Sequence, residues 1–334
     1  MNWFKYRLPN STDIVSGASH TLVKGFGKGF VVAPFLNPEK FLLNIPFDFI
    51  PESHDIKAIN SSLPLSTPKS DYQLEIKAIK DKLDGNRGKI VAARVIRLDI
   101  SIDLNATFDS LCQSYPNAFV FSFSTSETGT WIGASPELLL RKDKEFLTTM
   151  ALAGTRPCSD IDEQWDEKNL DEQAMVTEFI IDSLIKNCGT VTVGKTFTKK
   201  AGPIEHICTP IAAFMPPSEL ADEYEDSYIN RLRQLLTELS PTPALCGSDR
   251  SQSLELIRDY EKFSREMYGG FCGPNDIEDN TAFFVNLRSA KVSKNAVAIY
   301  AGGGITPLSN SDDEWNETEM KSKTIINHLK TSEE

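Results

Sequence analysis

The chain has 334 residues, of which 40% are hydrophobic and 25% are charged. This composition is typical of a globular protein with one large domain or two ordinary ones. The formal net charge of −12 disfavours nucleic acids and anionic membranes as partners, because both require a basic surface. It permits a small anionic substrate, since a bound metal or a few cations can reverse the field inside one pocket.

The cysteines and the apolar segments indicate the cellular compartment in which the protein functions. The six cysteines are far apart and form no CxxC pair, and no apolar stretch at the N-terminus resembles a signal peptide. We therefore expect free buried thiols rather than disulfides. No apolar run reaches the roughly 18 residues of a membrane span. The sequence predicts a soluble, cytoplasmic protein with no membrane partner.

The N-terminal part, residues 18–49, has the pattern of strands and turns. Its closely spaced glycines, Gly25, Gly27 and Gly29, lack the full GxGxxG pattern, and no convincing helix follows them. We interpret them as hairpin glycines rather than as a nucleotide-binding loop. Residues 51–71 are rich in proline, serine and charge, which is typical of a connection.

The rest of the chain mixes helices and strands without a regular βα alternation. Apolar spacing predicts helices at 72–84, 105–115, 166–187, 223–238, 250–265 and 313–330. Strands are predicted at 89–98, 117–124, 130–133, 145–153, 190–197, 204–208, 268–273, 282–292 and 296–301. This order predicts an α+β fold, a single large domain of mostly antiparallel β-sheets flanked by helices.

Two acidic helices carry the first candidate site residues. Glu172 lies within the helix at 166–187, and Glu317 lies in the last helix, three residues after Glu314 and four before Lys321. Spacing alone favours a solvated charged face with a surface ion pair. The other interpretation is a magnesium site, because Mg²⁺ takes oxygen ligands and usually one or two protein carboxylates.

Several further residues have two interpretations. Lys89 begins a strand, where a lysine is usually exposed, although a partly buried lysine can act as a base. His206 precedes a Thr-Pro turn and is structural or catalytic. Gly154 and Gly302 fit turns or bulges, and they would also let the backbone approach a bound carboxylate closely.

Ten short segments occur in the order that is typical of one enzyme family. They are KIVAAR (89–94), GASPELLLR (133–141), LAGTR (152–156), KNLDEQAMV (168–176), IEHICTP (204–210), SPTPALCG (240–247), SREMYGGFCG (264–273), VNLRSAKV (285–292), YAGGGITP (300–307) and EWNETEMK (314–321). With them the chain resembles the chorismate-utilising enzymes, which include anthranilate synthase component I, aminodeoxychorismate synthase, isochorismate synthases and salicylate synthases. The resemblance implies a chorismate-binding catalytic domain at 71–330, with residues 1–70 as a variable N-terminal part of the same domain.

The resemblance implies a role for each matching residue. Lys89 matches the base that activates water, and Glu137 matches the general acid that protonates the departing C4 hydroxyl. Glu172 and Glu317 match the two ligands of a Mg²⁺ cofactor. The positions that line the chorismate pocket match Gly154, Thr155, His206, Ala244, Leu245, Tyr268, Arg288, Gly302 and Lys321.

Two positions indicate which member of the family the chain resembles most. Lys89 favours water over ammonia as the nucleophile, and Ala153 stands where aminodeoxychorismate synthases tend to have a nucleophilic lysine. Both favour an isochorismate synthase, an isomerase of menaquinone or siderophore biosynthesis that needs no glutamine amidotransferase partner.

Three alternatives stay open. They are a salicylate synthase, which adds the elimination of pyruvate, the large subunit of an anthranilate or aminodeoxychorismate synthase, and an inactive chorismate-binding relative. Gln173 and Pro157 depart from the family pattern, which often has a histidine and a second arginine at these positions.

Overall fold

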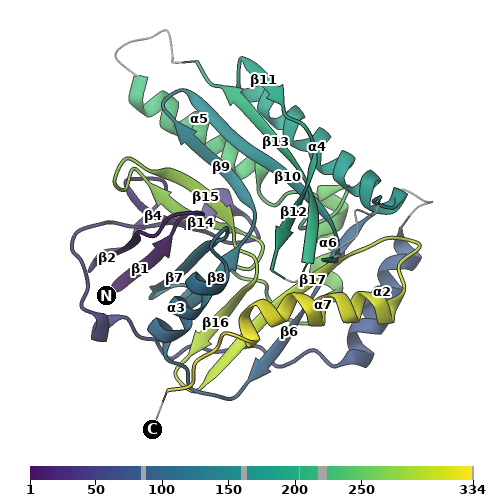
Figure 1. The fold of residues 1–334 in the computed structure, drawn as a ribbon, viewed down its shortest axis with the longest axis horizontal. Helices are drawn as coiled ribbons and strands as arrows, with labels where there is room; N and C mark the ends of the chain where they lie inside the picture. Colours follow the sequence, from purple (N-terminus) through teal and green to yellow (C-terminus); the bar gives the residue numbers. More distant parts are fainter. Residues whose placement is uncertain (84–87, 159–163, 203, 217–223, 333–334) are drawn as a thin grey trace.

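The computed structural model describes residues 1–83, 88–158, 164–202, 204–216 and 224–332. Two β-sheets face each other, and helices cover their outer faces (Figure 1). Neighbouring strands pair in antiparallel fashion throughout the described part of the chain. The predicted α+β fold of mostly antiparallel sheets flanked by helices is thus confirmed.

The first sheet has seven strands in the order β2-β1-β7-β8-β16-β17-β6. Their bounds are β1 (Asn2–Arg7), β2 (Ile14–Ser19), β6 (Ile90–Leu98), β7 (Phe119–Thr125), β8 (Gly129–Ser135), β16 (Ser289–Ser293) and β17 (Ala296–Ile305). Because β1 pairs with both β2 and β7, the N-terminal segment lies in the same sheet as strands from the end of the chain.

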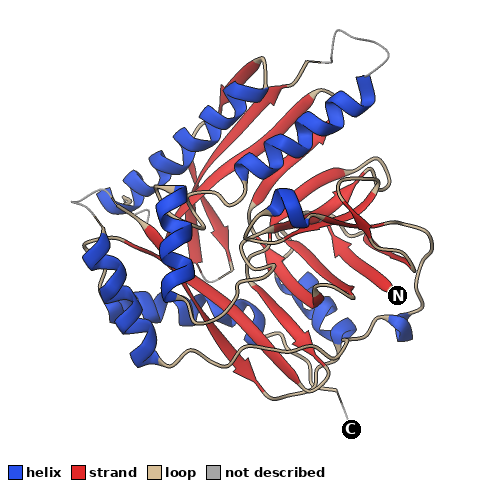
Figure 2. Ribbon diagram, turned by 180° about the vertical axis from the view of Figure 1, so that it is seen from behind, coloured by secondary structure: helices blue, strands red, loops and turns tan. Residues whose placement is uncertain are grey.

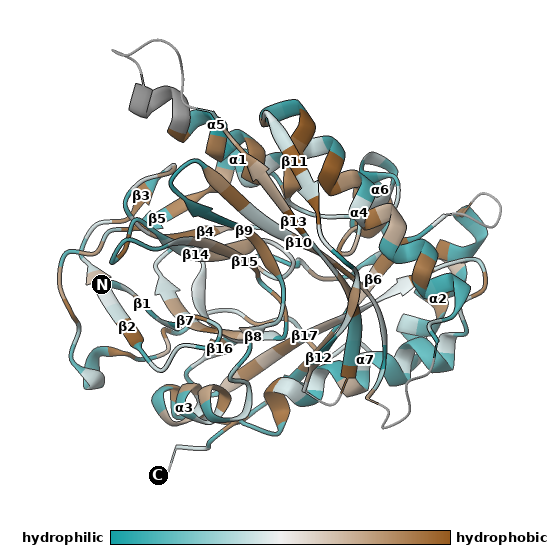
Figure 3. Ribbon diagram, turned by 45° about the horizontal axis from the view of Figure 1, so that its top comes forward, coloured by the Kyte–Doolittle hydropathy of each residue, from teal (hydrophilic) through white to brown (hydrophobic). Residues whose placement is uncertain are grey.

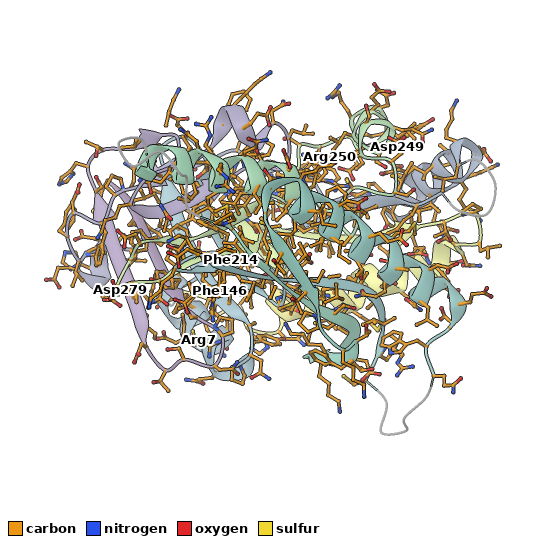
Figure 4. The ribbon with its side chains drawn as sticks, turned by 90° about the horizontal axis from the view of Figure 1, so that it is seen from above. Arg7, Phe146, Phe214, Asp249, Arg250 and Asp279 are labelled. Carbon is orange, nitrogen blue, oxygen red and sulfur yellow. The ribbon has the colours of Figure 1, made fainter. Side chains whose placement is uncertain are left out.

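The second sheet has ten strands in the order β11-β13-β10-β9-β15-β14-β4-β5-β3, with β12 also paired to β13. Their bounds are β3 (Val23–Lys24), β4 (Gly29–Ala33), β5 (Leu43–Ile45), β9 (Leu138–Asp143), β10 (Phe146–Pro157), β11 (Thr190–Val193), β12 (Phe197–Ala201), β13 (Ile204–Phe214), β14 (Phe271–Asn275) and β15 (Thr281–Val285). The long strands β10 and β13 pair along most of their length, and at one end Phe146 packs against Phe214 with ring centroids 5.5 Å apart (Figure 4).

An aromatic core fills the space between the two sheets. Phe119 of β7 stacks on Phe284 of β15 with ring centroids 4.2 Å apart, and Phe4 of β1 stacks on Phe30 of β4 at 5.0 Å. Strands place alternate side chains on opposite faces, so each sheet presents one apolar face to the other. Figure 3 shows the facing strands coloured mostly apolar. Burial of such large rings holds the sheets together.

Helices form the outer layers, as the view from behind also shows (Figure 2). Helices α4 (Glu167–Asn187) and α5 (Tyr224–Leu239) pack against each other and on the ten-stranded sheet. Helices α3 (Leu104–Ser114) and α7 (Ser311–Ile326) pack on the seven-stranded sheet. The remaining helices are α2 (Lys69–Lys82), which packs on α7 and β6, α6 (Arg250–Tyr260) on β6, and the short α1 (Pro38–Phe41) and η1 (Ser53–Asp55).

Three predicted elements were wrong in extent. The helix expected at 250–265 ends at Tyr260, because Glu261 has an extended backbone and its carboxylate binds Arg265 and the amide of Ala93. The strand expected at 282–292 is interrupted before Arg288, whose φ of 48° does not fit a strand. The strand expected at 190–197 is two separate strands, β11 and β12.

Two other expectations concern the whole chain. All six cysteines are free thiols, as predicted, but only Cys208, Cys246 and Cys272 are buried, whereas Cys112, Cys158 and Cys188 are partly exposed. No helix of the described residues combines the length and the apolar character that crossing a membrane requires.

Candidate active site

A central pocket of about 180 Å³ is lined by residues of β6 and β17 from one sheet, β10 and β13 from the other, and by α4 and α7. Twelve of the thirteen residues singled out in the sequence line it. They are Glu137, Gly154, Thr155, Glu172, His206, Ala244, Leu245, Tyr268, Arg288, Gly302, Glu317 and Lys321. The fold therefore brings together residues that are widely separated in the chain.

Lys89 is the exception, because it lies just behind the pocket wall. Its side chain is 2% exposed, and its Nζ donates a hydrogen bond to Glu172 Oε1 at 2.5 Å. A Cβ on Gly304, which lines the pocket, would lie 2.6 Å from Lys89 Cε, so a side chain there would displace the lysine. With Glu172, Lys89 also lines a separate cavity of about 510 Å³. The lysine thus adjoins the central pocket beside Glu172 and Gly304.

Glu137 is a buried carboxyl group that follows β8. Burial raises its pKa to about 8, although Lys199, Lys89 and Arg288 act in the opposite direction. At neutral pH this side chain is therefore mostly protonated. A protonated carboxyl group that lines a pocket can donate its proton to a leaving group.

His206 on β13 is a neutral imidazole. Its Nδ1 lies 2.8 Å from the carbonyl oxygen of Gly154 and 3.1 Å from Thr155 Oγ1, so we assign its proton to Nδ1. Burial and then the nearby Arg288 lower its pKa to about 3. The unprotonated Nε2 accepts a hydrogen bond from Arg288 Nη2 at 3.4 Å. His206 therefore holds the guanidinium group at the pocket.

Two backbone irregularities present these groups to the pocket. The pairing of β10 with β13 shifts in register between Ala153 and Arg156, and Gly154 within this bulge has a φ of 68°, which glycine adopts without steric cost. Arg288 has a φ of 48° although it is not a glycine. Such strained conformations cluster at functional sites.

Two carboxylates in the pocket are paired with lysines. Lys321 Nζ binds Glu317 Oε1 at 2.5 Å and the carbonyl oxygen of Gly302 at 2.9 Å. Burial would raise the pKa of Glu172, but Lys89 and Lys321 outweigh burial and the pKa is lowered. Glu172 is therefore ionised at neutral pH and available to bind a cation.

Glu314, one turn before Glu317, adds a third carboxyl group. Its Oε2 is buried and has no hydrogen-bond partner in the described part of the chain, whereas its Oε1 accepts from Ser309 Oγ at 2.6 Å. Burial and then Glu317 raise its pKa. A Cβ on Gly303 would lie 2.9 Å from Glu314 Oε2 and 3.7 Å from Glu317 Oε1, so both carboxyl groups lie against this glycine.

These oxygen donors fit a magnesium ion. Glu172 and Glu317 line the pocket, and carboxylate oxygens are ligands that Mg²⁺ prefers. The unpartnered Oε2 of Glu314 lies near Glu317, although Glu314 does not line the pocket. One or two protein carboxylates are usual for Mg²⁺, and among the described residues no group of three or more histidine, cysteine, aspartate or glutamate side chains could hold a metal.

Two further residues at the site, Asn169 and Lys199, were not predicted from the sequence. Asn169 lines the pocket, and its Oδ1 accepts a hydrogen bond from the amide of Thr155 at 3.1 Å. Its position three residues before Glu172, on the same helix face, was a usable signal. Lys199 donates to the carbonyl oxygen of Pro136 at 2.8 Å, beside Glu137. Nothing local in the sequence indicates this contact, which depends on how β12 pairs with β13.

Known proteins resemble this chain in sequence. The model of the family described as chorismate binding enzyme matches residues 51–330. The isochorismate synthase EntC of Escherichia coli (strain K12) is 32% identical over 251 residues, which are 72% of this chain and 61% of that protein. The isochorismate synthase MenF of Bacillus subtilis (strain 168) is 30% identical over 259 residues, 72% of this chain and 51% of that protein. The chain thus spans less than two thirds of the length of these relatives.

Solved structures share the fold. A putative 2,3-dihydroxybenzoate-specific isochorismate synthase, DhbC from Bacillus anthracis, matches with a TM-score of 0.79 and 24% identity, covering 97% of this chain and 95% of that one. Anthranilate synthase component I from Streptococcus pneumoniae TIGR4 matches with a TM-score of 0.68 and 14% identity, covering 96% and 89%. At these identities the likeness concerns the fold.

Proposed function

We propose that this chain, which belongs to the chorismate binding enzyme family, is a magnesium-dependent isochorismate synthase that interconverts chorismate and isochorismate. The observation that carries the proposal is the central pocket, which combines the protonated Glu137 with Glu172, Glu317 and Arg288 and has Lys89 at its wall. The relatives that are named isochorismate synthases support it.

Chorismate is a dianion, so its pocket must supply positive charge and hydrogen-bond donors. Arg288 and Lys321 line the pocket and can each bind a carboxylate. Tyr268 adds a hydroxyl group, while Ala244 and Leu245 offer an apolar wall to the ring. Magnesium held by Glu172 and Glu317 would supply further positive charge against the ring carboxylate.

The chemistry needs a proton donor and a proton acceptor. Water attacks C2 of the ring while the C4 hydroxyl leaves. Glu137 donates its proton to the leaving oxygen, and Lys89 accepts a proton from the attacking water. As a base Lys89 acts through the lone pair of its unprotonated amine, which can face the water while Nζ donates to Glu172 Oε1. Holding both groups beside the ring supplies orientation as well.

The proposal has three further parts. Because water is the nucleophile, the enzyme needs no glutamine amidotransferase. Its product feeds menaquinone or siderophore biosynthesis. Residues 1–70 form a variable part of the same domain as residues 71–330, and the pairing of β1 with β7 and of β4 with β14 supports one shared domain.

The identity of the product tests the proposal. Purified protein is incubated with chorismate and MgCl₂, with and without ammonium chloride, and the products are separated by liquid chromatography. Isochorismate in equilibrium with chorismate, independent of ammonia, is expected. Salicylate with pyruvate would establish a salicylate synthase instead, and a reaction that starts only with ammonia would establish a nitrogen-transferring enzyme. No reaction under either condition would indicate an inactive relative.

A further inference from the structure

A second, smaller cavity adjoins the central pocket. It has a volume of about 130 Å³, roughly ten times the minimum that one ordered water needs. We call it the Tyr115 cavity. It shares Pro136 and Arg288 with the central pocket, and its other lining residues include Tyr115, Lys199, Gly202 and Thr324. No part of the proposed reaction uses it.

The charge of this lining is unlike that of the chain as a whole. The sequence has 47 acidic and 35 basic residues, yet the described lining contains Lys199 and Arg288 and no aspartate or glutamate. Lys200 also lines the cavity, but it follows Lys199 on β12 and pairs with Glu205, so its side chain lies on the other face of the strand. Glu137 lies close by, but it lines only the central pocket and is mostly protonated. The Tyr115 cavity is therefore a concentrated positive site in an acidic protein.

Two of the cations are held in place by the fold. Lys199 Nζ donates to the carbonyl oxygen of Pro136 at 2.8 Å and contacts Met150 Sδ at 3.4 Å. An ammonium group has three donors, so one N–H remains for a ligand. Arg288 is fixed by its hydrogen bond to His206. A ligand would thus meet cations that are already positioned, which lowers the entropic cost of binding.

Neutral hydrogen-bond donors lie at the same place. The ring of Tyr115 packs edge-on against His328 with centroids 5.1 Å apart, and a Cβ on Gly202 would lie 2.9 Å from Tyr115 Cε1. The ring is therefore confined from two sides. Its hydroxyl group interacts with Thr324, whose own hydroxyl is buried. Cations and hydroxyl donors around one small cavity suit an oxyanion.

We propose that the Tyr115 cavity binds a small oxyanion of the size of pyruvate or inorganic phosphate, held by Lys199 and Arg288. Because Arg288 lines both cavities, an anion here and a dianion in the central pocket share one guanidinium group and repel each other. Each therefore weakens the binding of the other by the same factor. This coupling rests on the proposed function, whereas the binding of the oxyanion itself does not.

Calorimetric titration without chorismate tests the binding. Pyruvate and phosphate are titrated separately at constant ionic strength, which shows whether the site prefers a carboxylate or a phosphate. Saturable binding of at least one of them is expected. Lys199→Met should weaken it more than tenfold, because it removes a positioned ammonium group. If Lys199→Met does not fold, Lys199→Gln, which keeps a donor for the carbonyl oxygen of Pro136 but no charge, replaces it and should also weaken binding more than tenfold.

Two control variants locate the anion. Lys321→Ala changes a lysine that lines only the central pocket, and Lys323→Ala changes an exposed lysine next to Thr324 that lines neither cavity. Both should leave the affinity for the oxyanion within twofold of the wild type. The proposal is overturned if neither anion binds saturably, if Lys321→Ala abolishes binding while Lys199→Met does not, or if Lys323→Ala weakens it as much as Lys199→Met. None of these results depends on turnover of chorismate.

Discussion

Lys89 and Glu172, 83 residues apart in the chain, are joined by a hydrogen bond of 2.5 Å between Nζ and Oε1. Lys89 directly precedes β6 at one wall of the pocket, and Glu172 lies on α4 at another. The bond links the proposed base to a proposed metal ligand. Substitutions at the two positions should therefore not be additive, because each changes the charge that the other faces.

Glu137→Gln should lower kcat by about 10²- to 10⁴-fold, the usual contribution of a general acid. The amide keeps the shape of the side chain but has no acidic proton, so folding and chorismate binding should persist. Steady-state kinetics and a fluorescence binding titration measure both effects. Glu127→Gln, at an exposed turn residue between β7 and β8, is the control. Near-normal turnover by Glu137→Gln would exclude Glu137 as the general acid.

The pH dependence of wild-type activity should show the titration of Glu137. Glu137 is active when protonated, and its pKa is about 8. On the alkaline side, activity should therefore fall about tenfold per pH unit above pH 8, as the carboxyl group of Glu137 loses its proton. The profile of kcat/KM gives this value for the free enzyme. A profile that is flat through this region in the wild type would contradict the assignment.

Glu75 on α2 should make stability depend on pH. Burial, followed by Glu261, raises its pKa to about 8, and its Oε1 has no partner among the described residues. Between about pH 4.5 and 8 the folded state keeps a proton that the unfolded state has lost. Stability should therefore fall as pH rises, by up to about 1.4 kcal/mol per unit from this group.

Urea unfolding at a series of pH values measures this effect. Glu75→Gln cannot ionise, so its free energy of unfolding should depend less steeply on pH than that of the wild type. Asp81→Asn, an exposed position on the same helix, should leave the slope unchanged. Equal slopes in all three proteins would show that Glu75 is ionised in the folded state.

If Glu172 on α4 and Glu317 on α7 bind magnesium, substitution of either residue should weaken metal binding. Glu172→Gln and Glu317→Gln should each weaken Mg²⁺ binding at least tenfold, because an amide oxygen carries no charge, and turnover should fall with it. Calorimetric titration with MgCl₂ measures binding independently of activity. Glu178→Gln, exposed on the same helix as Glu172, is the control. Normal turnover by either variant in the presence of a chelator would contradict the assignment of Glu172 and Glu317 as magnesium ligands.

The sequence predicted the architecture well where patterns are local. The helix at 166–187 has a regular apolar stripe, and α4 has nearly the same bounds. The strand at 282–292 was predicted as continuous because its residues are mostly apolar or β-branched, and no local signal indicates the left-handed conformation of Arg288. Strand continuity therefore depends on how the loop before β16 packs.

The site residues could be named only from the ordered motifs, since each residue alone fitted a surface or structural role better than a functional one. Their gathering in one pocket agrees with those motifs, but the position of Lys89 behind Gly304 could not be predicted. It results from the pairing of β6 with β17, which is a contact between distant parts of the chain. Long-range pairing of this kind leaves no periodic signal in the sequence.

Isotope labelling during turnover tests the central claim most directly. The protein is incubated with chorismate and MgCl₂ in water enriched in oxygen-18, without ammonia, and the product is analysed by mass spectrometry. We predict isochorismate with one oxygen-18 atom at C2, because water attacks C2 while the C4 hydroxyl leaves. Isochorismate without the label, or a wild-type protein that forms no isochorismate, would contradict the account.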